Sequence, residues 1–94
     1  KSKWDMINSD MKDIILEFAD CMKNGVNPSD SSVQAIVKKW QEFITENYYL
    51  CNNEILYGLS EMYTKDERFR INIDNYGNGT AEFMSEAIKV YCNC

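Results

Sequence analysis

The chain has 94 residues, with 10 Lys and Arg, 15 Asp and Glu, no His and a formal net charge of −5 at pH 7. This length fits one domain and excludes two of ordinary size, and the acidic balance argues against direct contact with a nucleic-acid backbone. Without His the chain lacks the commonest general base and the commonest metal ligand, and its 45% hydrophobic content predicts a small acidic globular domain.

The first predicted helix has apolar residues at steps of three and four, which form one apolar stripe. This stripe consists of Trp4, Ile7, Met11, Ile14, Ile15, Phe18 and Met22. Gly25 is a natural helix stop. In the loop that follows, Ser31 and Gln34 form a predicted S-x-x-Q capping box. Ser29 and Asp30 are alternative caps for the next helix.

The second predicted helix has the same period, with an apolar stripe of Val33, Ile36, Val37, Trp40, Phe43 and Ile44. The pattern weakens over residues 48–53, which predicts a break or kink. A third helix is expected from about Asn53 to Tyr63, with Ile55, Leu56, Leu59, Met62 and Tyr63 as its apolar residues. A glycine inside a helix is unfavourable, so Gly58 suggests close packing or the wall of a ligand site.

Thr64 and Glu67 form a T-x-x-E capping box that predicts the start of a fourth helix, with Phe69, Ile71 and Ile73 as its apolar residues. Asn78 or Thr80 is expected to cap a fifth helix, whose apolar face consists of Ala81, Phe83, Met84, Ala87, Ile88 and Tyr91. Five helices without a strand pattern predict an all-α domain, a compact bundle of about five helices. No run of 18 apolar residues exists, so no membrane span is expected.

The four cysteines are Cys21, Cys51, Cys92 and Cys94. This number is low for a disulfide-rich scaffold, and the spacing lacks the close pairs of a typical zinc site. We therefore expect free thiols in a reducing cytoplasm and no metal or other cofactor.

Catalytic chemistry finds little support in the sequence. Cys51 would need Glu54 or a lysine as its base, but a nearby carboxylate raises the pKa of a thiol and makes it a poorer nucleophile. Residues 76–79 lack the preceding strand and the lysine of a phosphate-binding loop. The chain is therefore not expected to be an enzyme.

The aromatic residues are more informative. Tyrosine and tryptophan combine an apolar ring with a polar tip, and both are common in ligand pockets between helices. Most aromatic residues here fit a core position, since helical spacing alone predicts burial. Tyr48, Tyr49 and Tyr57 do not lie on a clean stripe, and they flank the predicted break and Gly58. These three tyrosines point to a pocket in that region.

Residues 59–69, LSEMYTKDERF, resemble the L-x-x-M-Y-x-x-D-x-R-F signature of TipAS-type antibiotic-recognition domains. These are the C-terminal effector domains of a subgroup of MerR-family transcription regulators. The similarity extends to residues 72–74, Gly79 and residues 81–88, and upstream to Trp4, residues 25–28 and the Tyr49-x-Cys51 element. It covers essentially the whole chain and implies one effector-binding domain over residues 1–94.

The resemblance implies a globin-like helical arrangement with a cleft for bulky, mostly apolar antibiotics such as thiopeptides, and thus a part in multidrug resistance. Together with the predicted break, it suggests as cleft lining Trp40, Tyr48, Tyr49, Cys51, Ile55, Tyr57, Gly58, Met62 and Phe83. The signature residues Met62, Tyr63, Asp66, Arg68 and Phe69 are expected to be structural, as caps and core anchors. Arg68 is expected to pair with Glu61 or Asp74.

The founding member of the family captures its ligand through a cysteine of the third helix, and that position aligns with Gly58 here. The resemblance therefore implies reversible binding for this chain. The chain opens with Lys1 and not Met, and we expect it to be a fragment. In that case a DNA-binding domain and a dimerising coiled coil lie outside it. We expect a homodimer for the full-length protein and a monomer for the fragment.

Two other functions remain open at this level. The chain is alternatively a helical protein-interaction module, with its aromatic surface docked on another helix. The third possibility is a thiol-based stress sensor that uses Cys51 or the Cys92 and Cys94 pair, which requires an exposed thiol of low pKa.

Overall fold

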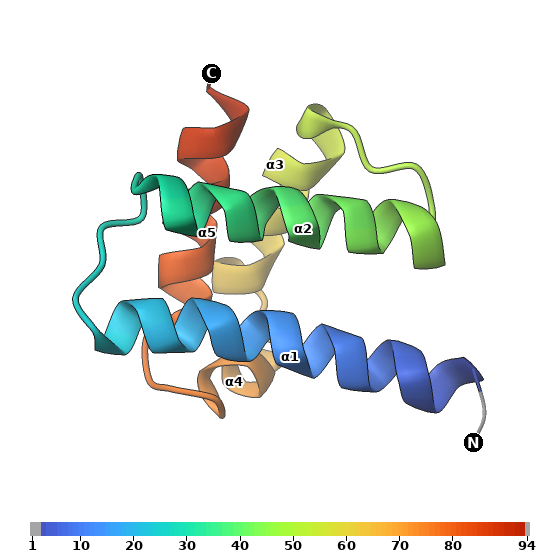
Figure 1. The fold of residues 1–94 in the computed structure, drawn as a ribbon, viewed down its shortest axis with the longest axis horizontal. Coiled ribbons are helices and arrows are strands. Elements are labelled where there is room, and N and C mark those ends of the chain that lie inside the picture. The colour runs from blue at the N-terminus through green and yellow to red at the C-terminus, as the bar shows by residue number, and fades with distance from the viewer. Residues whose placement is uncertain (1–2, 94) are drawn as a thin grey trace.

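The computed structural model describes residues 3–93, and these residues form five α-helices (Figure 1). The helices are α1 (Lys3–Lys23), α2 (Ser31–Asn47), α3 (Asn53–Lys65), α4 (Glu67–Asp74) and α5 (Thr80–Cys92). No strand occurs in the described part of the chain. The predicted all-α class and the number of helices are confirmed.

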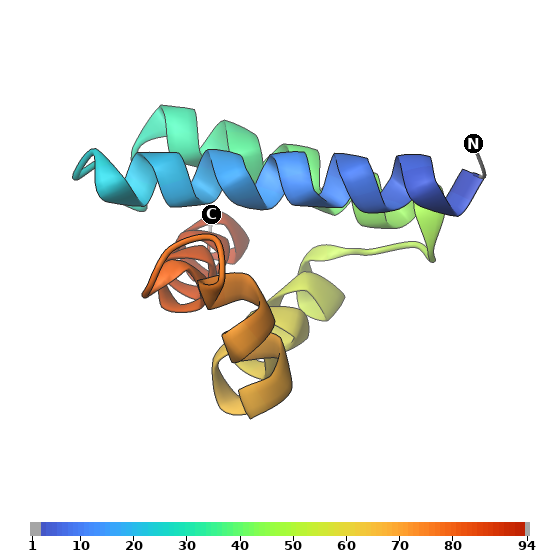
Figure 2. The same cartoon turned by 90° about the horizontal axis from the view of Figure 1, so that it is seen from below.

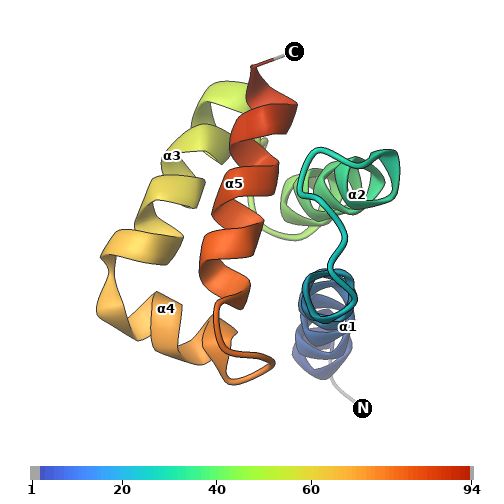
Figure 3. The ribbon, with the colours of Figure 1, turned by 90° about the vertical axis from the view of Figure 1, so that its left-hand side faces the viewer.

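The helices form two layers. Helices α1 and α2 lie side by side in one layer, and α3, α4 and α5 form the other (Figure 2). Helices α3 and α5 pack closely in antiparallel directions and cross the direction of α1 and α2 (Figure 3). Helix α5 contacts all four other helices, so it is the element that joins the two layers.

The apolar stripe of α2 is buried as predicted, and that of α5 is buried except for Tyr91, which is half-buried. The largest fully buried side chains include Phe18, Val33, Leu56, Met84 and Ile88, one or more from each of α1, α2, α3 and α5. The prediction that Trp4 belongs to the buried stripe of α1 is wrong, because Trp4 is 61% exposed. The prediction for α4 is wrong at Phe69 and Ile71, which are exposed, and only Ile73 of its three apolar residues is buried.

The cap of α2 is Asp30, one of the two alternatives to Ser31. The Asp30 carboxylate accepts hydrogen bonds from the backbone N–H and the hydroxyl of Ser32 at 2.9 Å and 2.7 Å, which lowers the pKa of Asp30. Ser31 is the first residue of the helix. The Gln34 side chain does not reach back to Ser31; it donates to the carbonyl of Ala87 in α5 at 3.0 Å.

The cap of α4 is Asp66, and not the predicted Thr64. The Asp66 carboxylate accepts from the backbone N–H of Arg68 at 3.0 Å, and the Arg68 guanidinium lies 3.7 Å from the same oxygen. Arg68 thus pairs with Asp66, and not with Glu61 or Asp74 as expected. The Thr64 hydroxyl instead donates to the carbonyl of Glu61 inside α3.

Helix α5 is capped from the end of α4. Gly79 is its N-cap and has no side chain to offer, so the predictions for Asn78 and Thr80 are wrong. The carboxylate of Asp74 accepts from the backbone N–H of Ala81 at 2.9 Å. A carboxylate at a helix N-terminus also interacts favourably with the helix dipole. This hydrogen bond fixes the turn between α4 and α5.

Gly79→Ala is expected to lower the free energy of unfolding by about 1 kcal/mol, because a positive φ is unfavourable for a residue with a Cβ atom. The φ of Gly79 is 91°, and an added Cβ would meet only Met22 Sδ at an ordinary 3.5 Å. Urea unfolding followed by circular dichroism measures the change.

Gly58→Ala is the matched control, because Gly58 lies inside α3 and an added Cβ meets nothing within 4 Å. This change should raise the free energy of unfolding by about 0.5–1 kcal/mol. Equal effects of the two substitutions would contradict this account of the turn.

Candidate ligand-binding pocket

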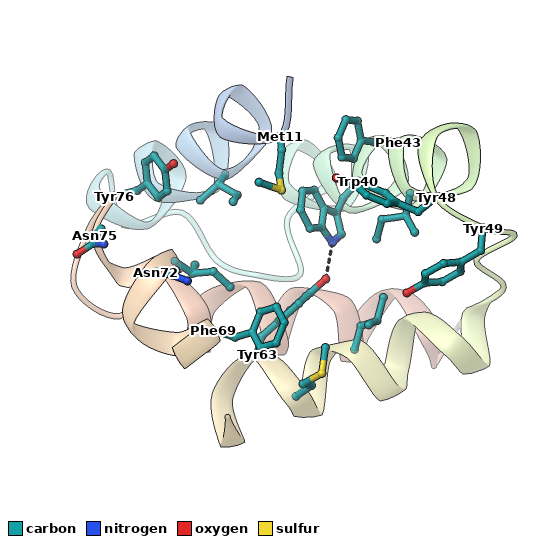
Figure 4. A pocket seen from close by; sticks show the side chains of 15 residues that line it. Met11, Trp40, Phe43, Tyr48, Tyr49, Tyr63, Phe69, Asn72, Asn75 and Tyr76 are labelled. Atoms are coloured by element: carbon teal, nitrogen blue, oxygen red, sulfur yellow. Dashed lines mark hydrogen bonds between the residues drawn. The ribbon is translucent and has the colours of Figure 1, made fainter. Parts of the chain in front are cut away.

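A pocket of about 560 Å³ lies between the two helical layers (Figure 4). It is lined by residues of four helices and of two connections: Met11, Ile15, Trp40, Phe43, Ile44, Tyr48, Tyr49, Leu59, Met62, Tyr63, Phe69, Asn72, Ile73, Asn75 and Tyr76. None of these side chains is charged. Its size falls within the range of pockets that hold small organic ligands.

Aromatic rings form a connected chain across the pocket. Trp40 stacks on Phe43 with ring centroids 5.7 Å apart, and Phe43 meets Tyr48 at 6.1 Å. On the other side, Trp40 meets Tyr63 at 6.3 Å, edge to face. Tyr63 in turn lies 6.2 Å from Phe69. These contacts link α2 with α3 and α4.

The floor of the pocket contains a polar contact between Trp40 and Tyr63. The indole N–H of Trp40 donates to the hydroxyl of Tyr63 at 3.3 Å (Figure 4). Burial raises the pKa of Tyr63 well above its ordinary value, although the hydrogen bond from Trp40 acts in the opposite direction. The Tyr63 hydroxyl therefore keeps its proton at neutral pH.

The rim of the pocket is formed by the connection between α2 and α3. Tyr48 and Tyr49 are 47% and 49% exposed, and Figure 4 shows the Tyr49 hydroxyl turned toward the pocket. The backbone N–H of Cys51 donates to the Thr45 hydroxyl at 3.1 Å, and the Asn52 side chain caps α3. These bonds hold the connection in place, so the two tyrosines are presented on an anchored segment.

Four of the nine residues expected to line the cleft belong to this pocket: Trp40, Tyr48, Tyr49 and Met62. Three of the five signature residues expected to be structural line it, namely Met62, Tyr63 and Phe69.

The other five residues expected to line the cleft lie outside this lining. Cys51 is buried in the connection before α3, and Phe83 is buried in α5. Ile55 lies exposed in the first turn of α3. Tyr57 is exposed on α3, with the Lys89 ammonium 5.9 Å from its ring centre. Gly58 is exposed, with open space beside it.

Several lining residues are not among those expected for the cleft. Met11 and Ile15 have the spacing of core residues of the first helix. Tyr76 belongs to the aromatic residues that favour a pocket, and Asn72 lies in a segment that resembles the family, but neither feature assigns them to the cleft. Asn75 has no such signal. Helical periodicity identifies an inward face, but it does not say whether that face meets another helix or a cavity.

The three described cysteines, Cys21, Cys51 and Cys92, are free thiols, and Cys94 lies outside the described residues. Burial raises the pKa of all three, with smaller contributions from nearby acidic groups for Cys21 and from Cys92 for Cys51. These thiols are therefore protonated at neutral pH, unlike the reactive thiol that a sensor requires.

Residues 3–93 contain no group of three or more Cys, Asp or Glu side chains that could hold a metal ion. No described helix is long and apolar enough to cross a membrane.

Residues 1–91 match the TipAS antibiotic-recognition domain family. The chain is 39% identical over 90 residues to the HTH-type transcriptional activator Mta of Bacillus subtilis strain 168, and the aligned region covers 96% of the chain and 34% of Mta. The chain is 31% identical over 88 residues to the HTH-type transcriptional activator TipA of Streptomyces coelicolor, and the aligned region covers 94% of the chain and 35% of TipA. The chain thus spans about a third of the length of these curated relatives.

A solved structure is also similar, namely TipAS in complex with nosiheptide, from a thiopeptide antibiotic multidrug resistance system of Streptomyces lividans. The TM-score is 0.90 at 29% sequence identity, and the match covers 96% of this chain and 63% of the TipAS chain. The family match, the two activators and the solved structure agree, and the chain belongs to the TipAS antibiotic-recognition domain family.

Proposed function

We propose that this chain is the ligand-sensing domain of a MerR-type transcriptional activator that reversibly binds a bulky, mostly apolar antibiotic of the thiopeptide kind. The observation that carries this proposal is the aromatic pocket between the two helical layers. The curated relatives of this chain are transcription activators and not enzymes. The similar TipAS structure is a complex with the thiopeptide nosiheptide. In the whole protein, DNA contact would belong to a separate domain, in a cytoplasmic homodimer.

The lining of the pocket suits such a ligand. Buried rings of Trp40, Phe43 and Tyr63 offer apolar faces, and aromatic side chains supply large contact areas at little conformational cost. The exposed rims at Tyr48 and Tyr49 leave the pocket open to a ligand larger than the cavity itself. The pocket would thus enclose one part of a bulky antibiotic, and the rest of the antibiotic would remain exposed to solvent.

The position of the pocket suggests how binding is sensed. The lining joins Met11 and Ile15 of α1 and Trp40 of α2 to Met62 and Phe69 of the other layer. A ligand that touches both layers favours the arrangement in which they are held together, and so shifts the population toward it. The contacts of α1 with the ligand would allow binding to influence the rest of the whole protein through this helix.

Reversible binding agrees with the chemistry of the pocket. None of the three described cysteines lines it, and the raised pKa of Cys51 keeps that nearby thiol protonated. A covalent bond to a thiol requires the thiolate. We therefore propose that affinity comes from contact area and hydrogen bonds.

One observation favours the alternative of a protein-interaction module. Trp4, Met6 and Leu50 are 61%, 63% and 74% exposed, and the Trp4 ring lies 6.5 Å from that of Tyr48 at the pocket rim. Large exposed apolar side chains are typical of contact surfaces. Binding of an antibiotic would distinguish the two functions, because a protein-interaction module does not require a site for a small molecule.

Trp4→Phe leaves Trp40 as the only tryptophan, since the sequence has two. Titration of this variant with nosiheptide should give a saturable change in Trp40 emission, because the indole lines the pocket. N-acetyltryptophanamide under the same conditions controls for light absorbed by the ligand. Unchanged Trp40 emission at nosiheptide concentrations at which calorimetry shows binding would contradict the proposed site.

Tyr49→Ala should weaken nosiheptide binding by about tenfold, the effect of removing an aromatic anchor. Tyr57→Ala is the matched control, because Tyr57 is similarly exposed, at 39% against 49%, but lies outside the pocket. The dissociation constant of nosiheptide for Tyr57→Ala should stay within twofold of its value for the unaltered protein. Isothermal titration calorimetry measures both variants, and the reverse order of effects would move the site to the other face of α3.

Incubation with nosiheptide should leave the intact mass of the protein unchanged after the free ligand is removed. The reason is that the pocket presents no thiol and the described thiols are protonated. Electrospray mass spectrometry provides the measurement. A mass gain equal to one ligand, lost again in Cys51→Ser, would show covalent capture by a different route.

A further inference from the structure

The pocket has two chemically different ends. Tyr48 and Tyr49 lie at one end, where α2 passes into the connection to α3, and Trp40 lies between the two ends (Figure 4). Asn72 and Asn75 lie at the opposite end, where α4 passes into the connection to α5, beside the ring of Tyr76 (Figure 4). Among the lining residues, side-chain amides occur only at this second end.

The fold uses some asparagine side chains for its own hydrogen bonds, and Asn72 and Asn75 are among those that it does not use. Asn52 caps α3 through its side-chain oxygen, Asn53 pairs with Gln41 at 2.8 Å, and Asn47 donates to a carbonyl of its own helix.

Asn75 contributes to the end of α4 only through its backbone N–H. Within the described residues, the hydrogen bonds of the protein leave the side-chain amides of Asn72 and Asn75 without a protein partner. Both amides therefore remain available to a ligand.

A side-chain amide carries two N–H donors and one carbonyl acceptor. This is the combination that a peptide group or a carboxamide needs from its partner. The rest of the lining has no charged side chain that would balance a charged ligand, and an unpaired charge is costly in an apolar pocket. The chemistry of the pocket thus favours an uncharged ligand that carries amide groups.

We propose that Asn72 and Asn75 recognise amide groups of an uncharged, peptide-like ligand and thereby fix which way round it lies in the pocket. This inference rests on the proposed function, because it takes the pocket to be the ligand site. Apolar contact supplies affinity with little directional preference, whereas a hydrogen bond forms only when donor and acceptor are suitably aligned. The two asparagines are therefore specificity-determining residues of this pocket.

The test compares two ligands that differ by one amide, pyrene and pyrene-1-carboxamide. Both are flat, uncharged and fluorescent, so their dissociation constants follow from direct titration. The unaltered protein should bind the carboxamide about 3- to 10-fold more tightly than pyrene, the usual gain from one or two hydrogen bonds. Asn72→Leu and Asn75→Leu should each reduce the ratio of the pyrene to the carboxamide dissociation constant toward one. Pyrene itself should bind these variants at least as tightly as it binds the unaltered protein.

Asn8→Leu is the matched control, because Asn8 is an exposed helical asparagine outside the pocket. It should leave the ratio unchanged. Asn72→Gln, which keeps the amide on a longer side chain, should retain part of the preference. Thermal unfolding of each variant shows whether it is folded, and an effect on stability alone would weaken both ligands equally.

Nosiheptide is titrated in parallel to separate the two proposals. If nosiheptide does not bind but the carboxamide preference is present and depends on Asn72 and Asn75, the amide recognition stands and the proposed thiopeptide class fails. If nosiheptide binds but the preference is missing, or survives both leucine substitutions, the inference on the asparagines is overturned. If all three ligands fail to bind, both proposals are overturned.

Discussion

Helix α5 and its burial determine how the other four helices are arranged. Ala81, Met84, Ala87 and Ile88 are fully buried, and α5 contacts every other helix. The small side chains of the two alanines let neighbouring helices approach closely, as dense packing requires. Helix α5 joins the two layers, and the pocket between them is lined by residues of the other four helices and of two connections.

Trp40 and Tyr63 serve both the core and the pocket. Each is nearly buried, and each contacts the other through a hydrogen bond and an aromatic contact. A change at either residue would therefore alter stability as well as binding. Tyr49, Asn72 and Asn75 contribute to the lining while exposed, so they are the residues at which ligand recognition can be separated from folding.

The distribution of charge suits a domain that senses an uncharged molecule. The chain carries a net charge of −5, but the charged side chains of residues 3–93 lie outside the pocket lining. Ion pairs such as Lys39 with Glu17, which joins α2 to α1, are exposed and add little to stability. An acidic surface is unsuited to DNA, which agrees with our proposal that DNA contact belongs to another domain of the whole protein.

The sequence by itself determined the number of helices, the all-α class and most of the inward-facing residues, because helical periodicity and the apolar stripes are local features. It also carried the family resemblance. Only the tertiary structure decided which inward faces meet a cavity, because the lining brings together α1, α2, α3 and α4 across long stretches of chain. For the same reason Asp74 as the cap of α5, Met11 in the pocket, and Tyr57 and Gly58 outside it were not predictable from spacing. Local pattern records which side of a helix is apolar, and packing between distant helices decides what that side contacts.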